Sequence, residues 1–196
     1  MAAKIVVIGA SVGGLSAIKI LLQNIPEDLK SPIIVVQHRH PDSRDKLRDI
    51  LQEYTSLKIR EVEDKDEISA GYVYLAPADY HLLVEPGFFA LSTDEPVSYA
   101  RPSIDVLFES AADVYGAQVI GVILTGANED GVQGLKMVKL HFGIAIVQEP
   151  TTAECPVMPK AAINAVAVDW ILPLEAIAKK LVYLCQLKEP SMKYKG

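Results

Sequence analysis

The chain has 196 residues, half of them hydrophobic, and a formal net charge of −6 at pH 7. This length and apolar content suffice for one domain with a full-sized core, which we expect over residues 1–187, followed by a flexible polar tail at 188–196. The charge is spread along the sequence without a basic run, which argues against nucleic acid as a partner.

Targeting and metal-binding patterns are missing from the sequence. The N-terminus lacks the pattern of a signal peptide, and no apolar stretch reaches membrane-spanning length, so we expect a cytoplasmic protein that does not insert into a membrane. Cys155 and Cys185 are too few for a disulfide framework and do not have the spacing of a metal site. We therefore expect neither a metal nor a cofactor.

Apolar strand-like runs alternate with helix-like periodic segments along the chain. In chain order, the predicted elements are a strand at Lys4–Ile8, a helix at Leu15–Gln23, a strand at Ile33–Gln37, a helix at Ser43–Tyr54, a strand at Lys58–Glu61, a hairpin-like cluster over Tyr72–Leu91 that turns at Glu85-Pro86-Gly87, a helix at Ile104–Tyr115, a strand at Val119–Leu124, a helix at Val132–His141, a strand at Ile144–Gln148, a helix at Lys160–Asn164, a strand at Ala165–Asp169 and a helix at Leu174–Gln186. Because fully apolar strands need cover on both faces, this order predicts an α/β fold. We expect a doubly wound, mostly parallel sheet flanked by helices, with an antiparallel hairpin region.

The first strand runs into a glycine-rich turn that reads G-A-S-V-G-G over residues 9–14. In the pattern G-x-S-x-G, a strand-to-helix turn projects the serine hydroxyl above the sheet edge, and the first amides of the helix point at an oxyanion formed there. A phosphate-binding turn begins similarly, although its spacing is G-x-G-x-x-G. Taken alone, Ser11 thus fits a nucleophile, part of an anion or nucleotide cradle, or a purely structural turn.

Two more polar side chains follow predicted strands. His38 ends V-V-Q-H after the second strand, and Asp130 ends L-T-G-A-N-E-D after Val119–Leu124. Ligands of such sheets bind beyond the carboxyl ends of the strands, so Ser11, His38 and Asp130 are expected to converge as an acyl-transfer triad. Their chain order differs from the Ser, Asp, His order of α/β-hydrolases.

Each of these residues also has a structural interpretation. Ser11 can bond within its own turn, and Asp130 equally fits an N-cap of the helix that begins near Val132. His40 competes with His38 as the base. His40 precedes Pro41 and is expected in an extended loop, whereas the sheet fixes the direction of His38, so we favour His38.

Five short segments, taken together with their order and approximate spacing, carry a resemblance to a known family. They are G-A-S-V-G-G, V-V-Q-H, A-R-P-S-I-D-V-L-F over residues 100–108, L-T-G-A-N-E-D-G, and C-P-V-M-P-K-A-A over residues 155–162. This set resembles the catalytic domain of CheB-type protein-glutamate methylesterases. The similarity covers roughly Lys4 to Leu184, and five ordered segments are far more specific than any one of them.

The resemblance implies a serine hydrolase that removes methyl esters from glutamate side chains of bacterial chemoreceptors, whose methylated cytoplasmic helices would be its partners in chemotaxis-like signalling. It implies Ser11 as the nucleophile, His38 as the base and Asp130 as the residue that orients the imidazole. The oxyanion would lie against backbone amides of Val12 and the Gly126–Ala127 turn. Some members also deamidate receptor glutamines, a second reaction open to the same triad.

Two further residues are placed by the resemblance at the rim of the site. Arg101 begins a turn into a helix with Ser103 as its N-cap, and its side chain would face acidic receptor sequence. Met158 lies near the start of the helix predicted from Lys160 and would be another rim residue.

The chain also departs from the family pattern. Val12, Ala127 and Asn128 stand where the family usually has a threonine-like residue, a methionine and a glycine. These changes keep backbone donors but alter side-chain hydrogen bonding near the oxyanion. Met1 leads within a few residues into the catalytic segment, so two alternatives stay open: a free-standing member without a receiver domain, or the catalytic part of a protein whose receiver domain has been removed. A free-standing member is expected to be insensitive to phosphodonors.

Two other functions stay open from sequence. The chain could be a catalytically idle signalling module that binds receptors, or a nucleotide-binding α/β domain supported by the glycine turn and by Tyr54-x-x-x-Lys58. The latter pair fits poorly, since Lys58 begins a predicted strand. After the second strand, the one acidic residue near the place where a ribose would bind is Asp42, in a predicted loop. The sequence does not indicate an oligomeric state.

Overall fold

The computed structural model describes residues 4–39 and 46–186. His40, the start of the predicted helix at Ser43 and the predicted tail at 188–196 lie outside these ranges. The strands are β1 (Ile5–Ala10), β2 (Ile33–Gln37), β3 (Lys58–Glu61), β4 (Tyr72–Leu75), β5 (His81–Glu85), β6 (Phe88–Ser92), β7 (Val119–Ile123), β8 (Ile144–Gln148) and β9 (Trp170–Leu172). The helices are α1 (Gly14–Gln23), α2 (Leu47–Gln52), α3 (Ile104–Tyr115), α4 (Val132–Leu140), α5 (Val157–Ala165) and α6 (Leu174–Gln186), with short 3-10 turns at Gly116–Gln118 and Pro150–Thr152.

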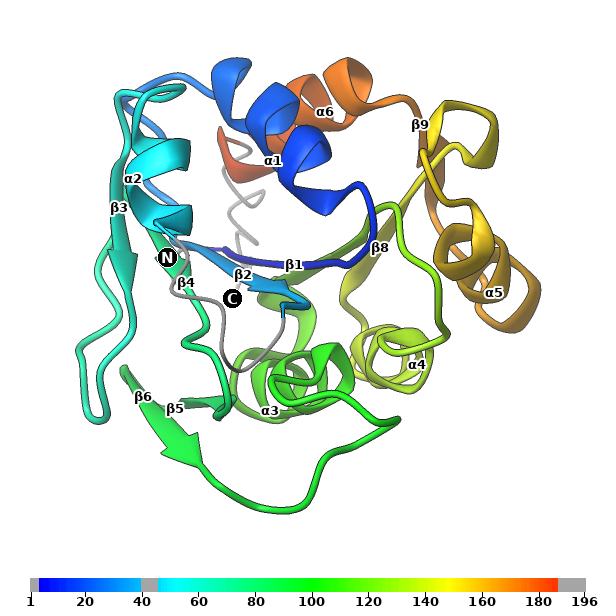
Figure 1. Ribbon diagram of the computed structural model, residues 1–196. Coiled ribbons are helices and arrows are strands. Elements are labelled where there is room, and N and C mark those ends of the chain that lie inside the picture. Colours follow the sequence, from blue (N-terminus) through cyan, green and yellow to red (C-terminus); the bar gives the residue numbers. More distant parts are fainter. Residues whose placement is uncertain (1–3, 40–45, 187–196) are drawn as a thin grey trace, which may run out of the picture.

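The main sheet is parallel throughout and has the strand order β3-β4-β2-β1-β7-β8-β9 (Figure 1). A separate antiparallel pair, β5 and β6, forms a hairpin whose turn lies at Pro86-Gly87. The predicted fold class is therefore confirmed. β1 lies in the middle of the sheet, and the chain reverses its direction of winding there, which is where α/β sheets bind their ligands.

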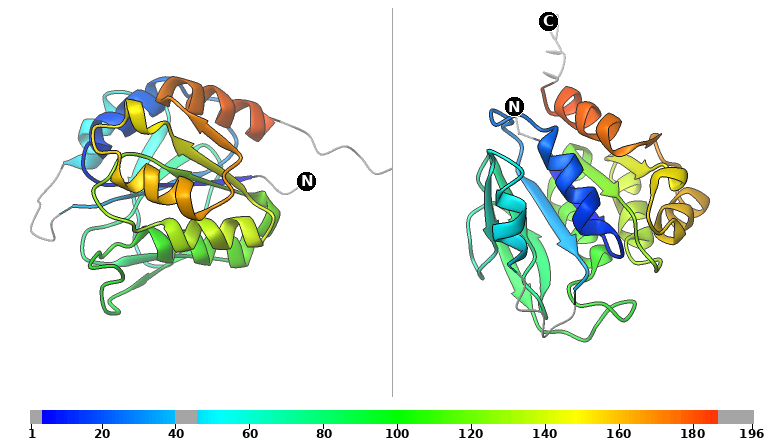
Figure 2. Two further views of the ribbon diagram at one scale, coloured as in Figure 1. Left: turned by 90° about the vertical axis from the view of Figure 1, so that its right-hand side faces the viewer. Right: turned by 45° about the horizontal axis from the view of Figure 1, so that its top comes forward.

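Helices cover both faces of the sheet. Val6 and Ile8 of β1 point into a core shared with α1, α2 and α6, whereas Ile5 and Val7 point into a second core shared with α3, α4 and α5. The side view in Figure 2 shows α6 on one side of the sheet, with α3 and α4 on the other. Burial on two faces explains why β1 is apolar at every position, without the alternation of a half-exposed strand.

Two predicted segments differ from the structure. The Tyr72–Leu91 cluster, expected as one hairpin, contains an additional parallel strand: Tyr72–Leu75 pairs between β3 and β2, where Val73, Tyr74 and Leu75 are buried. The strand expected at Ala165–Asp169 forms later, as β9. Helix α5 starts earlier and ends later than expected, and the connection after it is held by Asp169, whose carboxylate accepts from the Ala145 amide at 2.7 Å.

No helix in the two described ranges has the length and apolar character that a membrane crossing requires.

Helices α3 and α4 approach closely at Gly134. A Cβ atom at this position would lie 2.5 Å from the Cβ of Phe108 and 2.9 Å from the carbonyl oxygen of Asp105. The Asp105 carboxylate also accepts from the amides of Gly131 and Gly134, at 2.9 and 2.7 Å. A glycine is therefore required for this crossing.

We expect Gly134→Ala to lower the free energy of unfolding by roughly 1–3 kcal/mol, because the atoms that it meets are backbone or Cβ atoms that cannot rotate away. The matched control is Gln133→Ala on the exposed side of the same helix, which should change stability by less than about 0.5 kcal/mol. Urea unfolding followed by circular dichroism measures both. Equal stability of the two variants would contradict the close packing.

Candidate active site

The strand ends bring the predicted residues to one edge of the sheet. Ser11 and His38 each follow their strand by one residue, and the register pairs Ala10 with Gln37, so the two are neighbours across adjacent strands. The His38 amide donates to the Ala10 carbonyl at 2.9 Å, and the Ser11 amide donates to the Thr125 carbonyl beyond β7, also at 2.9 Å. Ser11 thus lies between the ends of β2 and β7.

A buried carboxylate meets the imidazole at this edge. Asp130 Oδ2 lies 2.7 Å from His38 Nε2, and the two side chains are 0% and 13% exposed. The carboxylate also accepts from Ser103 Oγ at 2.8 Å, from the Ile104 amide at 2.7 Å and from the Asp105 amide at 3.0 Å. These three donors belong to the first turn of α3, where the helix dipole favours a negative charge.

The hydrogen bonds determine the ionisation of Asp130. Burial by itself would raise the pKa of its carboxyl, but the bond from His38 and those from the Ile104 and Asp105 amides outweigh burial and lower the pKa below the usual 3.8. Asp130 is therefore an ionised acceptor, and His38 Nε2 carries the proton that it receives. Nδ1 of His38 is left as the acceptor nitrogen of a neutral imidazole.

The alternative role of Asp130 as the N-cap of α4 is wrong. The cap position is Gly131, in the left-handed conformation at φ 100°, and this residue has no side chain with which to cap the helix. The Asp130 side chain points instead to the first turn of α3, where its carboxylate accepts from backbone amides. Ser103 is the N-cap of α3 as predicted, accepting from the Val106 amide at 3.5 Å.

Asp105 is a second buried carboxylate, 5% exposed, whose role the sequence analysis missed. It accepts from the Gly131 and Gly134 amides at the start of α4, while Asp130, which lies just before α4, accepts from amides at the start of α3. An acid near the start of each helix therefore binds the first amides of the other. Burial and then the nearby charge of Asp130 raise the pKa of Asp105 to about 6, against the opposing bonds from the two glycines.

Ser11 sits on a rigid turn. Gly13 at φ 78° adopts a left-handed conformation, and Thr125 Oγ1 donates to the Val12 carbonyl at 2.8 Å while it accepts from the Cys155 amide at 2.8 Å. In the described part of the chain, the ring nitrogens of His38 are bonded to Asp130 and Asn128, and not to the Ser11 hydroxyl.

The backbone amides near Ser11 differ in what they can still bind. The Gly126 amide already donates to the Cys155 carbonyl at 3.0 Å, which removes it as an oxyanion donor. Across residues 4–39 and 46–186, the Val12 and Ala127 amides donate to no protein acceptor, and both residues are exposed. In the predicted Gly126–Ala127 turn, the Ala127 amide is therefore the one that is free to donate a hydrogen bond to an oxyanion.

Of the two expected rim residues, Arg101 lies at the site and Met158 lies beneath it. Met158 is fully buried beneath Gly126, so it forms part of the floor below Ser11 and not the rim. The Arg101 guanidinium is bound within the protein, since Nε and Nη2 donate to Asp79 at 3.0 and 2.6 Å and Nη1 donates to two backbone carbonyls. Arg101 nevertheless lines a cavity of about 380 Å³ together with His38 and Asn128.

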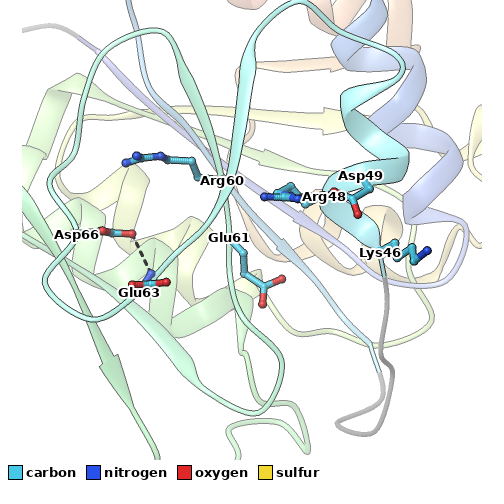
Figure 3. A pocket seen from close by; sticks show the side chains of 7 residues that line it. All are labelled: Lys46, Arg48, Asp49, Arg60, Glu61, Glu63 and Asp66. Carbon is cyan, nitrogen blue, oxygen red and sulfur yellow. Dashed lines mark hydrogen bonds and ion pairs between the residues drawn. The ribbon is translucent and has the colours of Figure 1, made fainter.

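A second hollow, of about 530 Å³, lies between α2 and β3 (Figure 3). Within residues 4–39 and 46–186, its lining consists of charged residues: Lys46, Arg48, Asp49, Arg60, Glu61, Glu63 and Asp66. Several of its groups are already paired, since Arg48 binds Asp49 at 2.6 Å and Glu61 binds Arg39 at 2.9 Å. Among the residues that the structure describes, neither a serine nor a histidine lines this hollow, and the candidate triad lies at the edge beyond β1, β2 and β7.

Comparisons with known proteins agree with this geometry. A family model described as CheB methylesterase matches residues 6–181. The chain belongs to the CheB methylesterase family. The family is one of carboxylic ester hydrolases, so both the recognition from sequence motifs and the predicted enzyme class are confirmed.

Curated relatives of this family carry matching names. A Leptospira interrogans protein, named provisionally as a protein-glutamate methylesterase/protein-glutamine glutaminase, is 49% identical over 182 residues, covering 92% of this chain and 94% of the relative. The Thermotoga maritima protein with the same two activities in its name is 36% identical, and the match covers 92% of this chain but only 54% of that longer protein. The crystal structure of the Thermotoga maritima CheB methylesterase catalytic domain superposes with a TM-score of 0.91 at 36% identity, covering 94% of this chain and all of that one.

The nucleotide-binding alternative loses one of its two sequence supports, the Tyr54-x-x-x-Lys58 pair, in the structure. Helix α2 ends at Gln52, and Lys58 starts β3, so Tyr54 and Lys58 do not share a helix.

We expect Asp130→Asn to fold less stably, by about 2–4 kcal/mol, because a carboxamide cannot accept the four donors that meet this buried carboxylate. Had Asp130 been an N-cap, the same change would cost little. Asp28→Asn, at an exposed position, is the control. Urea midpoints for both variants test this, and an unchanged midpoint for Asp130→Asn would show that the buried charge is dispensable.

The raised pKa of Asp105 predicts a pH dependence of stability. A carboxyl whose pKa is higher in the folded state adds stability that is complete below its unfolded value of 3.8 and is lost as the pH rises through about 6. Lowering the pH from about 7.5 to about 5 should therefore add roughly 1–2 kcal/mol through this group. Asp105→Asn should reduce that gain in urea titrations at the two pH values. An identical gain in the variant would assign the effect to other groups.

Proposed function

We propose that this protein is a serine hydrolase that removes methyl esters from glutamate side chains of bacterial chemoreceptors, with Ser11, His38 and Asp130 as its catalytic triad. The observation that carries the proposal is the 2.7 Å contact between His38 and the buried Asp130 at the strand end next to Ser11. The names of the relatives support the substrate class. Methylated cytoplasmic helices of receptors are the proposed partners, which makes the cytoplasm the place of action.

The proposed reaction has two halves. Ser11 Oγ attacks the ester carbonyl as its proton passes to His38 Nδ1, and the new imidazolium is stabilised by the Asp130 carboxylate. The carbonyl oxygen becomes an oxyanion, for which the Val12 and Ala127 amides are the proposed donors. The C–O bond to the methoxy group then breaks, and His38 returns the proton to the departing methanol, leaving an acyl-serine.

Hydrolysis of the acyl-serine completes the cycle. Water attacks the acyl carbon as it gives one proton to His38, the bond to Ser11 Oγ breaks, and the serine takes that proton from His38. The carboxylic acid product keeps the other proton, leaves, and releases it to solvent as the glutamate carboxylate forms. Methanol is a better leaving group than an amine, so a shallow site with exposed residues such as Val12 suffices. This exposure also suits an ester carried on the surface of another protein.

Deamidation of glutamine is a proposed second activity. The same attack on a carboxamide would expel ammonia after protonation by His38, and the final product would again be a glutamate carboxylate. The relatives' names pair the two activities, which supports testing both.

We expect Ser11→Ala and His38→Ala each to lower the rate of methanol release from methylated receptor fragments by about 10³-fold or more, because the members of a triad act as a unit. His141→Ala is the matched control, since this histidine lies at the end of α4 and bonds the Met137 carbonyl. Circular dichroism confirms folding of each variant. Wild-type protein that is folded but releases no methanol would favour the idle receptor-binding module.

A further inference from the structure

The imidazole of His38 has one nitrogen left for the serine. Nε2 is bonded to Asp130 at 2.7 Å, and Asp130 is ionised, so the proton between them belongs to Nε2. A neutral imidazole has a single acceptor nitrogen, which is here Nδ1. Any proton that leaves the Ser11 hydroxyl must therefore reach Nδ1.

In the structure, that nitrogen is bonded to Asn128. The carboxamide Nδ2 lies 3.4 Å from His38 Nδ1, and Oδ1 of the same group accepts from the Asp130 amide at 3.3 Å. The second bond fixes which end of the carboxamide faces the imidazole. Asn128 and Asp130 share one turn, so the residue that blocks Nδ1 and the residue that binds Nε2 are positioned together.

We propose that Asn128 is a positioning residue that holds His38 in a resting state by occupying the nitrogen that Ser11 must use, and that a bound ester or amide substrate releases it by offering its carboxamide another acceptor. The proposal rests on the proposed function and adds a control step to it. Asn128 lines the same cavity as His38, so a substrate carbonyl entering there meets both side chains.

His38 Nδ1 cannot bind Asn128, as in the resting state, and Ser11, as in the reactive state, at the same time. Nδ1 has one lone pair, so a bond from Asn128 and a bond from Ser11 compete for it. Once Nδ1 is protonated, its N–H would face the N–H of Asn128, and the carboxamide cannot rotate without losing the bond from the Asp130 amide. At 3.4 Å the contact is long for a hydrogen bond, so releasing it costs little.

Two substitutions at this position separate a resting contact from an ordinary structural role. Asn128→Ala removes the competing donor, and we expect Ser11 to react with a fluorophosphonate roughly two- to tenfold faster, the range set by one weak neutral hydrogen bond. Asn128→Asp keeps an oxygen for the Asp130 amide but places a negative charge against Nδ1. It should trap the imidazolium and slow labelling at least tenfold. Asn24→Ala, on the exposed end of α1, is the control.

A purely structural Asn128 predicts the reverse order, because aspartate preserves the turn and alanine does not. Nitrogen-15 spectra of histidine-labelled protein give a readout independent of activity, with His38 assigned through His38→Gln. In Asn128→Ala the Nδ1 signal should move downfield as the bond to it is lost.

Slower or unchanged labelling of Asn128→Ala, or an unmoved Nδ1 signal, would overturn the proposal. If the wild-type protein is not labelled at all, the serine hydrolase function itself fails, and the nitrogen spectra alone decide whether Asn128 holds the imidazole.

Discussion

The carboxylate of Asp130 is the centre on which the rest of the site depends. It is completely buried, yet four hydrogen bonds keep it ionised, and three of their donors are fixed by the first turn of α3. Asp105, in the first turn of α3, in turn accepts hydrogen bonds from the first amides of α4. Two helices are thus joined by crossed acid-to-amide contacts, and the imidazole of His38 takes its orientation from one of those acids.

The two acids differ in how far their surroundings favour the charged form. Asp130 is held ionised by its donors, whereas burial and the nearby charge of Asp130 bring the pKa of Asp105 to about 6, so Asp105 becomes protonated in mildly acidic solution. Asp130 is the acid that contacts the imidazole, at 2.7 Å, and its charge is the one placed to stabilise an imidazolium.

The parallel sheet and the meeting of His38 with Asp130 could be predicted from sequence, because apolar strands, their order and polar residues at strand ends are local signals. Contacts that depend on tertiary placement could not. The direction of the Asp130 side chain follows from the α3–α4 crossing, the burial of Met158 from its packing against Gly126, and the position of β9 from the bond between Asp169 and Ala145. Asn128 stood out in the sequence only as a departure from the family, and its contact with His38 emerged from the fold.

The register of β1 against β2 and β7 has an evolutionary consequence. Ser11 and His38 are held in line by backbone hydrogen bonds between strands, which do not depend on the identity of the side chains. Much of the sequence can therefore change while this framework is kept, as the TM-score of 0.91 at 36% identity illustrates for the fold. Divergence within this fold is then expected to gather in turns such as the one containing Ala127 and Asn128, where a substitution changes the reactivity of the site and leaves its framework intact.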